Sequence, residues 1–374
     1  MAESADVLVI GGGIAGLSAA AEIARNARVL VLEGETQIGF HSSGRSATML
    51  HYALGDALIR ALTLASRPFF DLPPDGFSAV PLGRRMAVLI HAREDERDAL
   101  DRLEADISRF VRLERLDAAG VRALCPLLKP DALYGIADCD GIRLDPHALL
   151  QGFARQLRGR GGQLRTGERV AGLTREGGGW KVTTEAGNSY SSQIVVNAAG
   201  AWADVVAGLA GVRPIGLQPK RRTIITFDAP AGTDLDGLPF AKTVGDELYF
   251  APESGRLFAS PMDEVPSDPC DAQPDEFEMA LAAQRIEERT IVNVERIHSR
   301  WAGLRSFAPD NHPVAGFAAE ADGFFWLAGQ GGAGLQTSPA MSRAAASLIL
   351  GFEWPLSGVD AAQLSPARFV GQPA

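Results

Sequence analysis

Short runs of apolar residues alternate along this chain with glycine-rich turns and with stretches of helical periodicity. The beginning of the sequence shows the pattern most clearly. An apolar run at residues 7–10 is followed by a glycine-rich turn at 11–16, a helical stretch at 17–25 and a second apolar run at 29–32. Uninterrupted apolar runs are typical of strands that are buried on both faces of a parallel sheet. The pattern therefore predicts a strand, turn, helix and strand at the start of the chain.

The same criteria predict further elements. Apolar residues at helical spacing predict a helix over residues 95–110. Asp145 followed by Pro146 is typical of a helix start, and we expect this helix to run to about Arg158. A long apolar helix is predicted at 335–350. Strands are predicted at residues 163–166, 169–174, 180–184, 189–198, 223–227, 248–250, 257–259 and 324–328.

Segments typical of a nucleotide-binding domain occur at the start, in the middle and at the end of the chain. We therefore expect an α/β fold in which a Rossmann-like domain is discontinuous in sequence and a substrate domain, of α+β type with an antiparallel sheet, is inserted into it. The predicted division is 1–80, 142–215 and 300–374 for the cofactor-binding domain, and 81–141 and 216–299 for the substrate domain. The 374 residues are enough for two hydrophobic cores.

Three glycines in the first turn have the spacing of a dinucleotide site. The first permits a tight turn, the second lets the backbone approach a pyrophosphate, and the third lets helix and strand pack closely. The phosphates then lie at the positive N-terminus of the helix. An acid at the end of the second strand accepts hydrogen bonds from a ribose and disfavours a 2′-phosphate. A tight turn without a ligand is the alternative. The expected contacts are Gly11, Gly13, Ile14, Ala15, Gly16 and Glu33.

Three other loops carry residues suited to a cofactor. Hydroxyls and an arginine in the loop 41–46 suit a diphosphate or a polar ring edge, and a solvated loop is the alternative. Small residues after the strand 189–198 allow close backbone approach, or simply end the strand. The glycines of 329–337 open a helix whose positive end suits a reduced flavin, and a flexible hinge is the alternative. The candidates are His41, Ser42, Ser43, Gly44, Arg45, Ser46, Ala199, Gly200, Trp202, Gly329, Gly331, Gly332, Gly334, Leu335, Gln336 and Thr337.

Composition excludes several other classes of protein. The net charge of −10 argues against a nucleic-acid-binding face. The 3 cysteines are far apart, which argues against a metal site, and their odd number fits a reducing compartment. We find no signal segment and no run of about 18 apolar residues that would span a membrane. We therefore expect a cytoplasmic protein with no metal and no membrane span.

Two arginines are candidates for binding a substrate carboxylate. Arg222 ends a basic cluster, and Arg305 lies in an apolar segment where an isolated charge is costly. A guanidinium group fits a carboxylate in a bidentate manner. An internal salt bridge is the alternative for both, and a solvated side chain for Arg222. Tyr249, on a predicted strand, is a candidate to close the same pocket, although half-buried strand tyrosines are common.

Together these segments resemble, in order and over nearly the whole chain, the D-amino acid oxidase superfamily of FAD-dependent oxidoreductases. Longer runs at 208–214, 216–222 and 301–307 are similar to bacterial D-arginine dehydrogenases. The resemblance implies non-covalently bound FAD, with Gly303 among its contacts. It further implies that the two arginines hold the substrate α-carboxylate under Tyr249 while a hydride passes from Cα to flavin N5. The imino acid then hydrolyses to a 2-oxo acid and ammonia.

The chain also departs from this pattern. Where D-arginine dehydrogenases carry a glutamate we align Arg85, and Met49 replaces their histidine, with His51, Tyr52 and Gly332 as further pocket candidates. Because desolvated guanidinium groups repel each other, we expect basic D-amino acids to be poor substrates. An acidic or neutral D-amino acid is expected instead, with Arg85 facing a side-chain carboxylate. If Arg85 is instead turned to solvent, we no longer expect a preference for acidic substrates, but we still expect basic D-amino acids to be poor substrates.

Other functions remain open at this stage. The same carboxylate clamp suits a 2-hydroxy acid such as 2-hydroxyglutarate, or an N-substituted amino acid. A NAD-linked protein or a nucleotide-binding module without redox chemistry is a second alternative, and a covalent flavin on His41 is a third. The electron acceptor is open among oxygen, a quinone and an electron carrier, so the sequence does not decide between oxidase and dehydrogenase.

Overall fold

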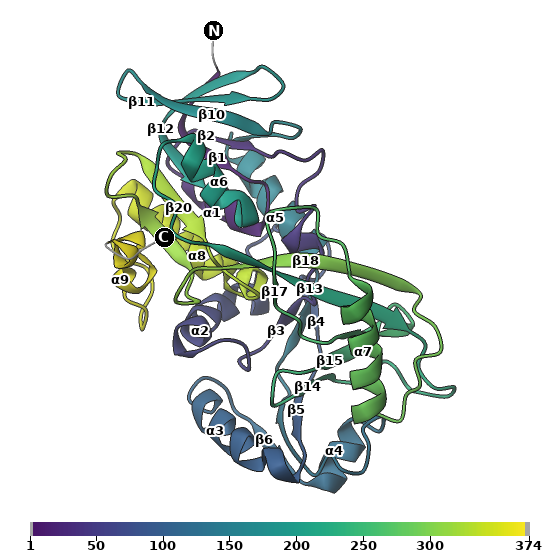
Figure 1. The fold of residues 1–374 in the computed structure, drawn as a ribbon. Coiled ribbons are helices and arrows are strands. Elements are labelled where there is room, and N and C mark those ends of the chain that lie inside the picture. Colours follow the sequence, from purple (N-terminus) through teal and green to yellow (C-terminus); the bar gives the residue numbers. More distant parts are fainter. Residues whose placement is uncertain (1–2, 371–374) are drawn as a thin grey trace.

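The computed structural model describes residues 3–370, and Figure 1 shows how they are arranged around two large sheets. The first sheet has eight strands, and its centre is parallel: β1 pairs with β2 and β12, and β12 pairs with β20. Its strands, in spatial order, are β10 (Val170–Glu176), β11 (Gly179–Thr184), β12 (Ser189–Asn197), β1 (Glu3–Ile10), β2 (Val29–Leu32) and β9 (Gln163–Arg165), with β20 (Phe324–Ala328) beside β12 and β19 (Val314–Phe317) beside β20.

Both faces of this sheet are covered, which explains the uninterrupted apolar run of β1. Val7 and Val9 belong to one hydrophobic cluster, and Leu8 and Ile10 belong to another on the opposite face. The first cluster includes side chains of α1 (Ile14–Ile23), α2 (Ala57–Asp71), α5 (Pro146–Gly159) and α8 (Gly334–Leu350). The second includes α6 (Ala203–Leu209).

The second sheet has nine strands and is antiparallel except where β14 pairs with β5. Its strands are β17 (Val265–Pro266), β13 (Gln218–Phe227), β16 (Arg256–Ser260), β15 (Tyr249–Glu253), β14 (Phe240–Thr243), β5 (Val88–Ala92), β7 (Tyr134–Asp138) and β6 (Glu114–Leu116), with β18 (Ser299–Phe307) beside β13. One face packs against α7 (Glu276–Arg289) and α4 (Ala118–Leu124). The other face packs partly against α3 (Arg97–Ile107) and partly lines a cavity.

A small sheet of three strands joins segments from both predicted domains. It contains β3 (Met49–Leu50), β8 (Ile142–Leu144) and β4 (Gly83–Arg85). The structure also differs from the predicted division at residue 300, because β18 pairs along its length with β13 of the nine-stranded sheet. In Figure 1 the long strands β13 and β18 lie in the part of the nine-stranded sheet that is nearer to the first sheet. The division into domains therefore stays a prediction, with a strand on the substrate side that the sequence did not assign there.

The helix predictions were confirmed with shifted ends. Asp145 caps α5, and its carboxylate accepts the Ala148 N–H at 2.9 Å. The helix expected at 95–110 spans residues 97–107, since residues 94–96 form a 3₁₀ turn before it and turns begin at Ser108. Short 3₁₀ turns also occur at Ser42–Gly44, Gly200–Trp202 and Pro366–Phe369, and α9 (Ala361–Leu364) precedes the last of these. None of the helices in the described part of the chain is long and apolar enough to cross a membrane.

Candidate active site

The first glycine-rich turn contains positions that a larger residue cannot occupy. Gly11 has φ of +112°, and a Cβ atom there would lie 2.4 Å from the carbonyl oxygen of Ala198. A Cβ atom on Gly16 would lie 2.0 Å from the carbonyl oxygen of Gly11. Gly13 is different, because its nearest neighbour would be the Ser43 hydroxyl at 3.4 Å. Two of the glycines thus permit the tight packing of strand and helix, and the middle one leaves the approach to the helix open.

Glu33 lies at the end of β2 beside this turn. Its Oε2 accepts the Gly12 N–H at 2.6 Å, and its Oε1 accepts the Glu35 N–H at 2.7 Å. A carboxylate has about four acceptor positions, so both oxygens retain lone pairs for a ribose diol. Gly12, which the sequence analysis did not single out, therefore orients the acid. A Cβ atom on Gly12 would lie 2.9 Å from Glu33 Oε2 and would disturb this contact.

Two adjoining cavities extend from the turn. The outer cavity is lined by the glycine turn, the end of β2 and the loop after β12, and the inner cavity lies between the start of α8 and the nine-stranded sheet. Ser42 and Ser43 line both, so the 3₁₀ turn at 42–44 marks where they meet. Candidates on the outer cavity are Gly11, Gly13, Glu33, His41, Ala199, Gly200 and Trp202. Candidates on the inner cavity are Ile14, Arg45, Ser46, Met49, His51, Arg222, Tyr249, Gly303, Arg305, Gly331, Gly332, Gly334 and Leu335.

Helix N-termini distinguish these cavities from the rest of the fold. Helices α2, α4, α5, α7 and α9 each begin with an aspartate whose carboxylate accepts backbone N–H groups. The helices α1 and α8, whose first residues line the cavities, have neither a side-chain cap nor an acid in the first turn. Their free N–H groups and positive ends are available to an anionic or electron-rich ligand. One N–H group at the start of α1 has a side-chain partner: the Ile14 N–H donates to the Ser43 hydroxyl at 3.0 Å.

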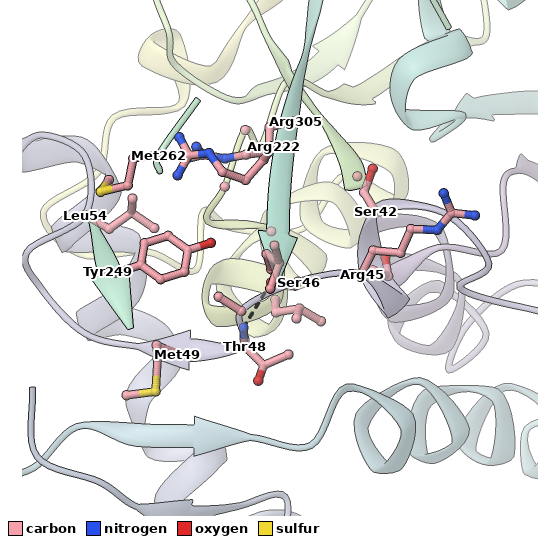
Figure 2. Close-up of a pocket in the computed structure, with 18 of the residues that line it drawn as sticks. Ser42, Arg45, Ser46, Thr48, Met49, Leu54, Arg222, Tyr249, Met262 and Arg305 are labelled. Atoms are coloured by element: carbon pink, nitrogen blue, oxygen red, sulfur yellow. Dashed lines mark hydrogen bonds between the residues drawn. The ribbon is translucent and has the colours of Figure 1, made fainter. Parts of the chain in front are cut away.

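The inner cavity brings the predicted substrate residues together. Figure 2 shows the guanidinium groups of Arg222 and Arg305 side by side, with Tyr249 and Met262 facing the same space. The β13–β18 register places Arg222 opposite Gly303, which carries no side chain, and Arg305 follows two residues later on the same face. The glycine thus leaves room for both guanidinium groups on one side of the sheet.

Glu264 pairs with both guanidinium groups. Its Oε1 lies 3.3 Å from Arg222 Nη2 and 3.3 Å from Arg305 Nη1, and its Oε2 lies 3.0 Å from Lys220 Nζ. Arg222 Nε also donates to the carbonyl oxygen of Asp263 at 2.7 Å. The internal salt bridge that the sequence left as an alternative is therefore present. Glu264 is not one of the residues that line the inner cavity.

One edge of the Arg305 guanidinium group stays free of protein partners. Within residues 3–370, neither Nε nor Nη2 has a hydrogen-bond acceptor, and both lie against Gly332. A Cβ atom on Gly332 would lie 2.3 Å from Nη2 and 2.7 Å from Nε. The Nε–Nη2 edge is one that binds a carboxylate in the bidentate manner. Burial, and secondly the charge of Arg222, lower the pKa of Arg305 to about 10, so the group is still charged at neutral pH.

The cavity offers no strong base. Burial and, to a smaller extent, the charge of Lys242 lower the pKa of His51 to about 3, so its imidazole is neutral near pH 7. Of the side chains that the structure describes, no aspartate or glutamate lines the inner cavity. The charged residues that line it are cations, namely Arg45, Arg222, Lys242 and Arg305, and the Arg45 guanidinium is already paired with Asp271.

Two predicted substrate residues lie elsewhere, and these predictions are corrected. Arg85 is on the exposed strand β4, where its guanidinium pairs with Asp140 at 2.8 Å and Asp71 at 3.5 Å. Carboxylates next to Arg85 at the surface hold it in solvent, away from the inner cavity. Tyr52 is buried, with its ring stacked on Phe110 at 6.4 Å, and it does not line the cavity either.

Gln336 supports the wall of the inner cavity from behind, and Arg45, which lines the cavity, has its guanidinium group held by other chain segments. Gln336 is buried, and its amide accepts the His51 N–H at 3.3 Å and donates to Thr63 Oγ1 at 2.7 Å. The guanidinium of Arg45 is engaged by Asp271 at 2.6 Å and by the carbonyl oxygens of Ala272 and Ala302, so it connects chain segments. The remaining candidates that line neither cavity are Ala15, Gly16, Gly44, Gly329 and Thr337.

Sequence reasoning missed several residues of the inner cavity. Ile224 lies on β13, Phe240 and Lys242 lie on β14, and Met262 follows β16. The strand β14 was not predicted because its four residues are flanked by turns and show no long apolar run. Phe240 and Lys242 are two residues apart, so in a strand they lie on the same face, and this spacing could have indicated their shared position. It was not used because a lysine in a strand is usually exposed.

His41 lies on the outer cavity. Its ring is 4.6 Å from the ring of Trp202, and its Nε2 lies 3.1 Å from Glu35 Oε1. It does not line the inner cavity, where the start of α8 and the substrate candidates meet. This position favours a non-covalent cofactor over a flavin bonded to His41.

The glycine turn, the uncapped start of α1 and Glu33 define a dinucleotide-binding domain, and the second sheet borders the inner cavity beside it. Residues 6–348 match the family described as FAD dependent oxidoreductase, and the chain belongs to this family. Its cofactor is FAD. The fit is visible in the uncapped N-terminus of α1, the glycine turn and Glu33 on the outer cavity.

Relatives with several different substrates share this architecture. The chain is 27% identical to FAD-dependent oxidoreductase domain-containing protein 1 of Bos taurus, over 93% of this chain and 82% of that protein. Glycine oxidase from Geobacillus kaustophilus has a TM-score of 0.86 at 21% identity, covering 99% of this chain and 100% of that one. FAD-bound L-alpha-glycerophosphate oxidase from Mycoplasma pneumoniae has a TM-score of 0.84 at 20% identity, covering 95% and 96%. The comparisons thus establish the family, and the substrate has to be argued from the site.

Proposed function

We propose that this protein catalyses the FAD-dependent oxidation of an acidic or neutral D-amino acid to the imino acid, which water then converts to a 2-oxo acid and ammonia. The free Nε–Nη2 edge of Arg305, beside Arg222 and across from Tyr249, carries the proposal. This edge and the neighbouring Arg222 guanidinium support a site for one carboxylate in the inner cavity. The D configuration is supported by the resemblance of three segments to D-arginine dehydrogenases.

The chain's own residues bind and orient the substrate. Arg305 and Arg222 hold the α-carboxylate, and Gly332 leaves the space in which the guanidinium edge lies. Tyr249, 6% exposed on β15, covers the same space. FAD, when bound, supplies the two-electron acceptor for the hydride of the substrate carbon. Burial lowers the pKa of His51 to about 3 and no carboxylate of the described chain lines the cavity, so we expect the substrate to react as the neutral amine, with orientation providing much of the acceleration.

The charge of the cavity supports the exclusion of basic substrates. Arg222, Arg305 and Lys242 face it, and no carboxylate of the described chain lines it. A D-arginine or D-lysine side chain would therefore meet like charge without a compensating acid, which costs several kcal/mol when desolvated. This support does not depend on Arg85, which the sequence had placed here.

Anaerobic bleaching of the flavin by a panel of D-amino, L-amino, N-substituted amino and 2-hydroxy acids tests the proposal. We expect an acidic or neutral D-amino acid to bleach the flavin fastest and to release one ammonia per flavin reduced. Fastest bleaching by D-arginine would overturn the proposed specificity. Bleaching by a 2-hydroxy acid without ammonia would replace the proposed reaction with alcohol oxidation.

A further inference from the structure

Lys242 is the least expected residue of the inner cavity. It is only 3% exposed, and it lies on β14 in register with Tyr249 of β15. Residues opposite each other in an antiparallel pair project from the same face, so both side chains face the cavity. Phe240, two residues earlier on β14, shares that face and stacks against Tyr249 at 5.2 Å. The ammonium group therefore interrupts an otherwise aromatic wall.

The only ion-pair partner of Lys242 in the part of the chain that the structure describes is Asp246. Asp246 lies in the turn between β14 and β15 with φ of +56°, and its side chain is 66% exposed. An ion pair with so exposed an acid stabilises a fold little, whereas removing an ammonium group from water is costly. The ammonium group of Lys242 carries three N–H donors, and Asp246 is too exposed to compensate for its burial. The pairing of Lys242 with Asp246 therefore does not by itself explain why the lysine is buried.

A second polar group beside Lys242 also lacks a partner. His51 Nδ1 is buried and has no hydrogen-bond partner in residues 3–370. The His51 ring packs on Phe240 at 5.6 Å, Phe240 and Lys242 alternate on one face of β14, and His51 and Lys242 line the same cavity. A neutral imidazole can donate a hydrogen bond from one of its ring nitrogens. Lys242 and His51 thus form a second polar subsite within the cavity that contains Arg222 and Arg305.

We propose that Lys242 determines specificity by binding a second carboxylate of the substrate, which makes the substrate an acidic amino acid. The inference rests on the proposed function, because the substrate's α-carboxylate occupies Arg222 and Arg305. The four strands β13, β16, β15 and β14 are consecutive in the sheet and β18 lies beside β13, so at the backbone Lys242 is three strand spacings from Arg222 and four from Arg305. The long side chains of all three residues line the same cavity. A substrate with a carboxylate at each end satisfies both subsites.

The decisive measurement compares acidic amino acids with their amides, which differ in charge but hardly in shape. For the wild-type holoenzyme we expect kcat/KM to be about 10- to 100-fold higher for D-glutamate or D-aspartate than for the matching D-glutamine or D-asparagine. Lys242→Met should abolish this ratio, and Lys242→Arg should restore part of it because the charge returns. Asp246→Asn removes the ion pair but keeps the ammonium group, so it should retain the ratio. Equal losses for acid and amide in Lys242→Met would overturn the inference.

A binding experiment separates this inference from the reaction itself. Glutarate and its monoamide are titrated into the holoenzyme, and binding is followed by the change in flavin absorbance and by the melting temperature. We expect wild type to bind glutarate about 10-fold or more tightly than the monoamide, and Lys242→Met to lose that difference. If no D-amino acid reduces the flavin but this difference is present, the proposed reaction fails and the second carboxylate subsite stands. If D-amino acids react but glutarate gains nothing from Lys242, the subsite is refuted.

Discussion

The outer and inner cavities recognise their ligands by different means. Around the outer cavity the important features belong to the backbone: Gly11 and Gly16 permit close packing, and the start of α1 presents uncapped N–H groups. Around the inner cavity they belong to side chains, with the charges of Arg222, Arg305 and Lys242 delivered by three different strands. Backbone recognition suits a cofactor that is common to a whole family, and side-chain recognition is where relatives with different substrates can diverge.

The largest effect should come from a substitution that disturbs the backbone packing around the outer cavity. In Gly16→Ala the new Cβ would lie 2.0 Å from the Gly11 carbonyl oxygen, so strand and helix must separate. We expect a loss of about 3 kcal/mol in the free energy of unfolding and nearly complete loss of bound FAD, measured by melting temperature and by the flavin-to-protein absorbance ratio. Gly208→Ala, in the helix α6 with open space around its Cβ position, is the matched control and should retain FAD.

Removing a charge from the inner cavity should spare the cofactor. We expect Arg305→Met or Arg222→Met to lower kcat/KM by about 10²- to 10³-fold while FAD content stays near one per chain, because each contributes to carboxylate binding. Steady-state kinetics with the best substrate of the panel provide the measurement. Arg221→Met is the control, since Arg221 pairs with Glu278 and does not line the cavity. Loss of FAD from the Arg305 variant would show that the two cavities are not separable.

A smaller effect should come from Gly332, where backbone and side-chain recognition meet. Gly332→Ala places a Cβ atom 2.3 Å from Arg305 Nη2, so the guanidinium edge must shift. We expect KM to rise about 10-fold with little change in FAD content. Gly245→Ala is a fitting control, because its Cβ position meets nothing closer than 3.8 Å. An unchanged KM in Gly332→Ala would argue against the bidentate edge.

The pH profile tests whether the inner cavity contains a base. With its pKa lowered to about 3 by burial, His51 stays neutral as pH rises from 5 to 9, so its protonation cannot control activity there. We expect kcat/KM to rise with pH as the substrate amine loses its proton, with the same midpoint in His51→Leu as in wild type. A midpoint that follows the substituted residue instead of the substrate amine would assign the proton transfer to His51.

The smallest effect should come from Arg85, which lies outside both cavities. Its pairs with Asp71 and Asp140 are exposed, and such pairs contribute about 0–1 kcal/mol. We therefore expect Arg85→Gln to keep the ratio of kcat/KM for D-glutamate and D-glutamine within about 2-fold. A collapse of that ratio would return Arg85 to the substrate site and weaken the assignment of Lys242.

Much of the cofactor end was predictable because its determinants are local. The turn, the helix N-terminus and Glu33 lie within about thirty residues, and their spacing has direct geometric meaning. The parallel strands β1, β2 and β12 were predictable from their apolar runs, since both faces are covered. Arg222, Arg305 and Tyr249 were candidates from their residue types and sequence settings, with structural alternatives open, and the resemblance to a family suggested their roles. The structure brings all three to one cavity.

What the sequence determined by itself is the order of its elements and the glycine turn that suits FAD. The tertiary structure decided which charges face the substrate. Arg85 resembled a pocket residue in sequence but pairs with surface acids, while Lys242 resembled an ordinary surface lysine and is buried beside Tyr249. The reason is physical: a shift of one residue in strand register moves a side chain to the opposite face of the sheet. A strand that is exposed, as β4 is, leaves its side chains to pair with acids at the surface. Local spacing determines backbone shape, but only the packed sheet determines where a charge points.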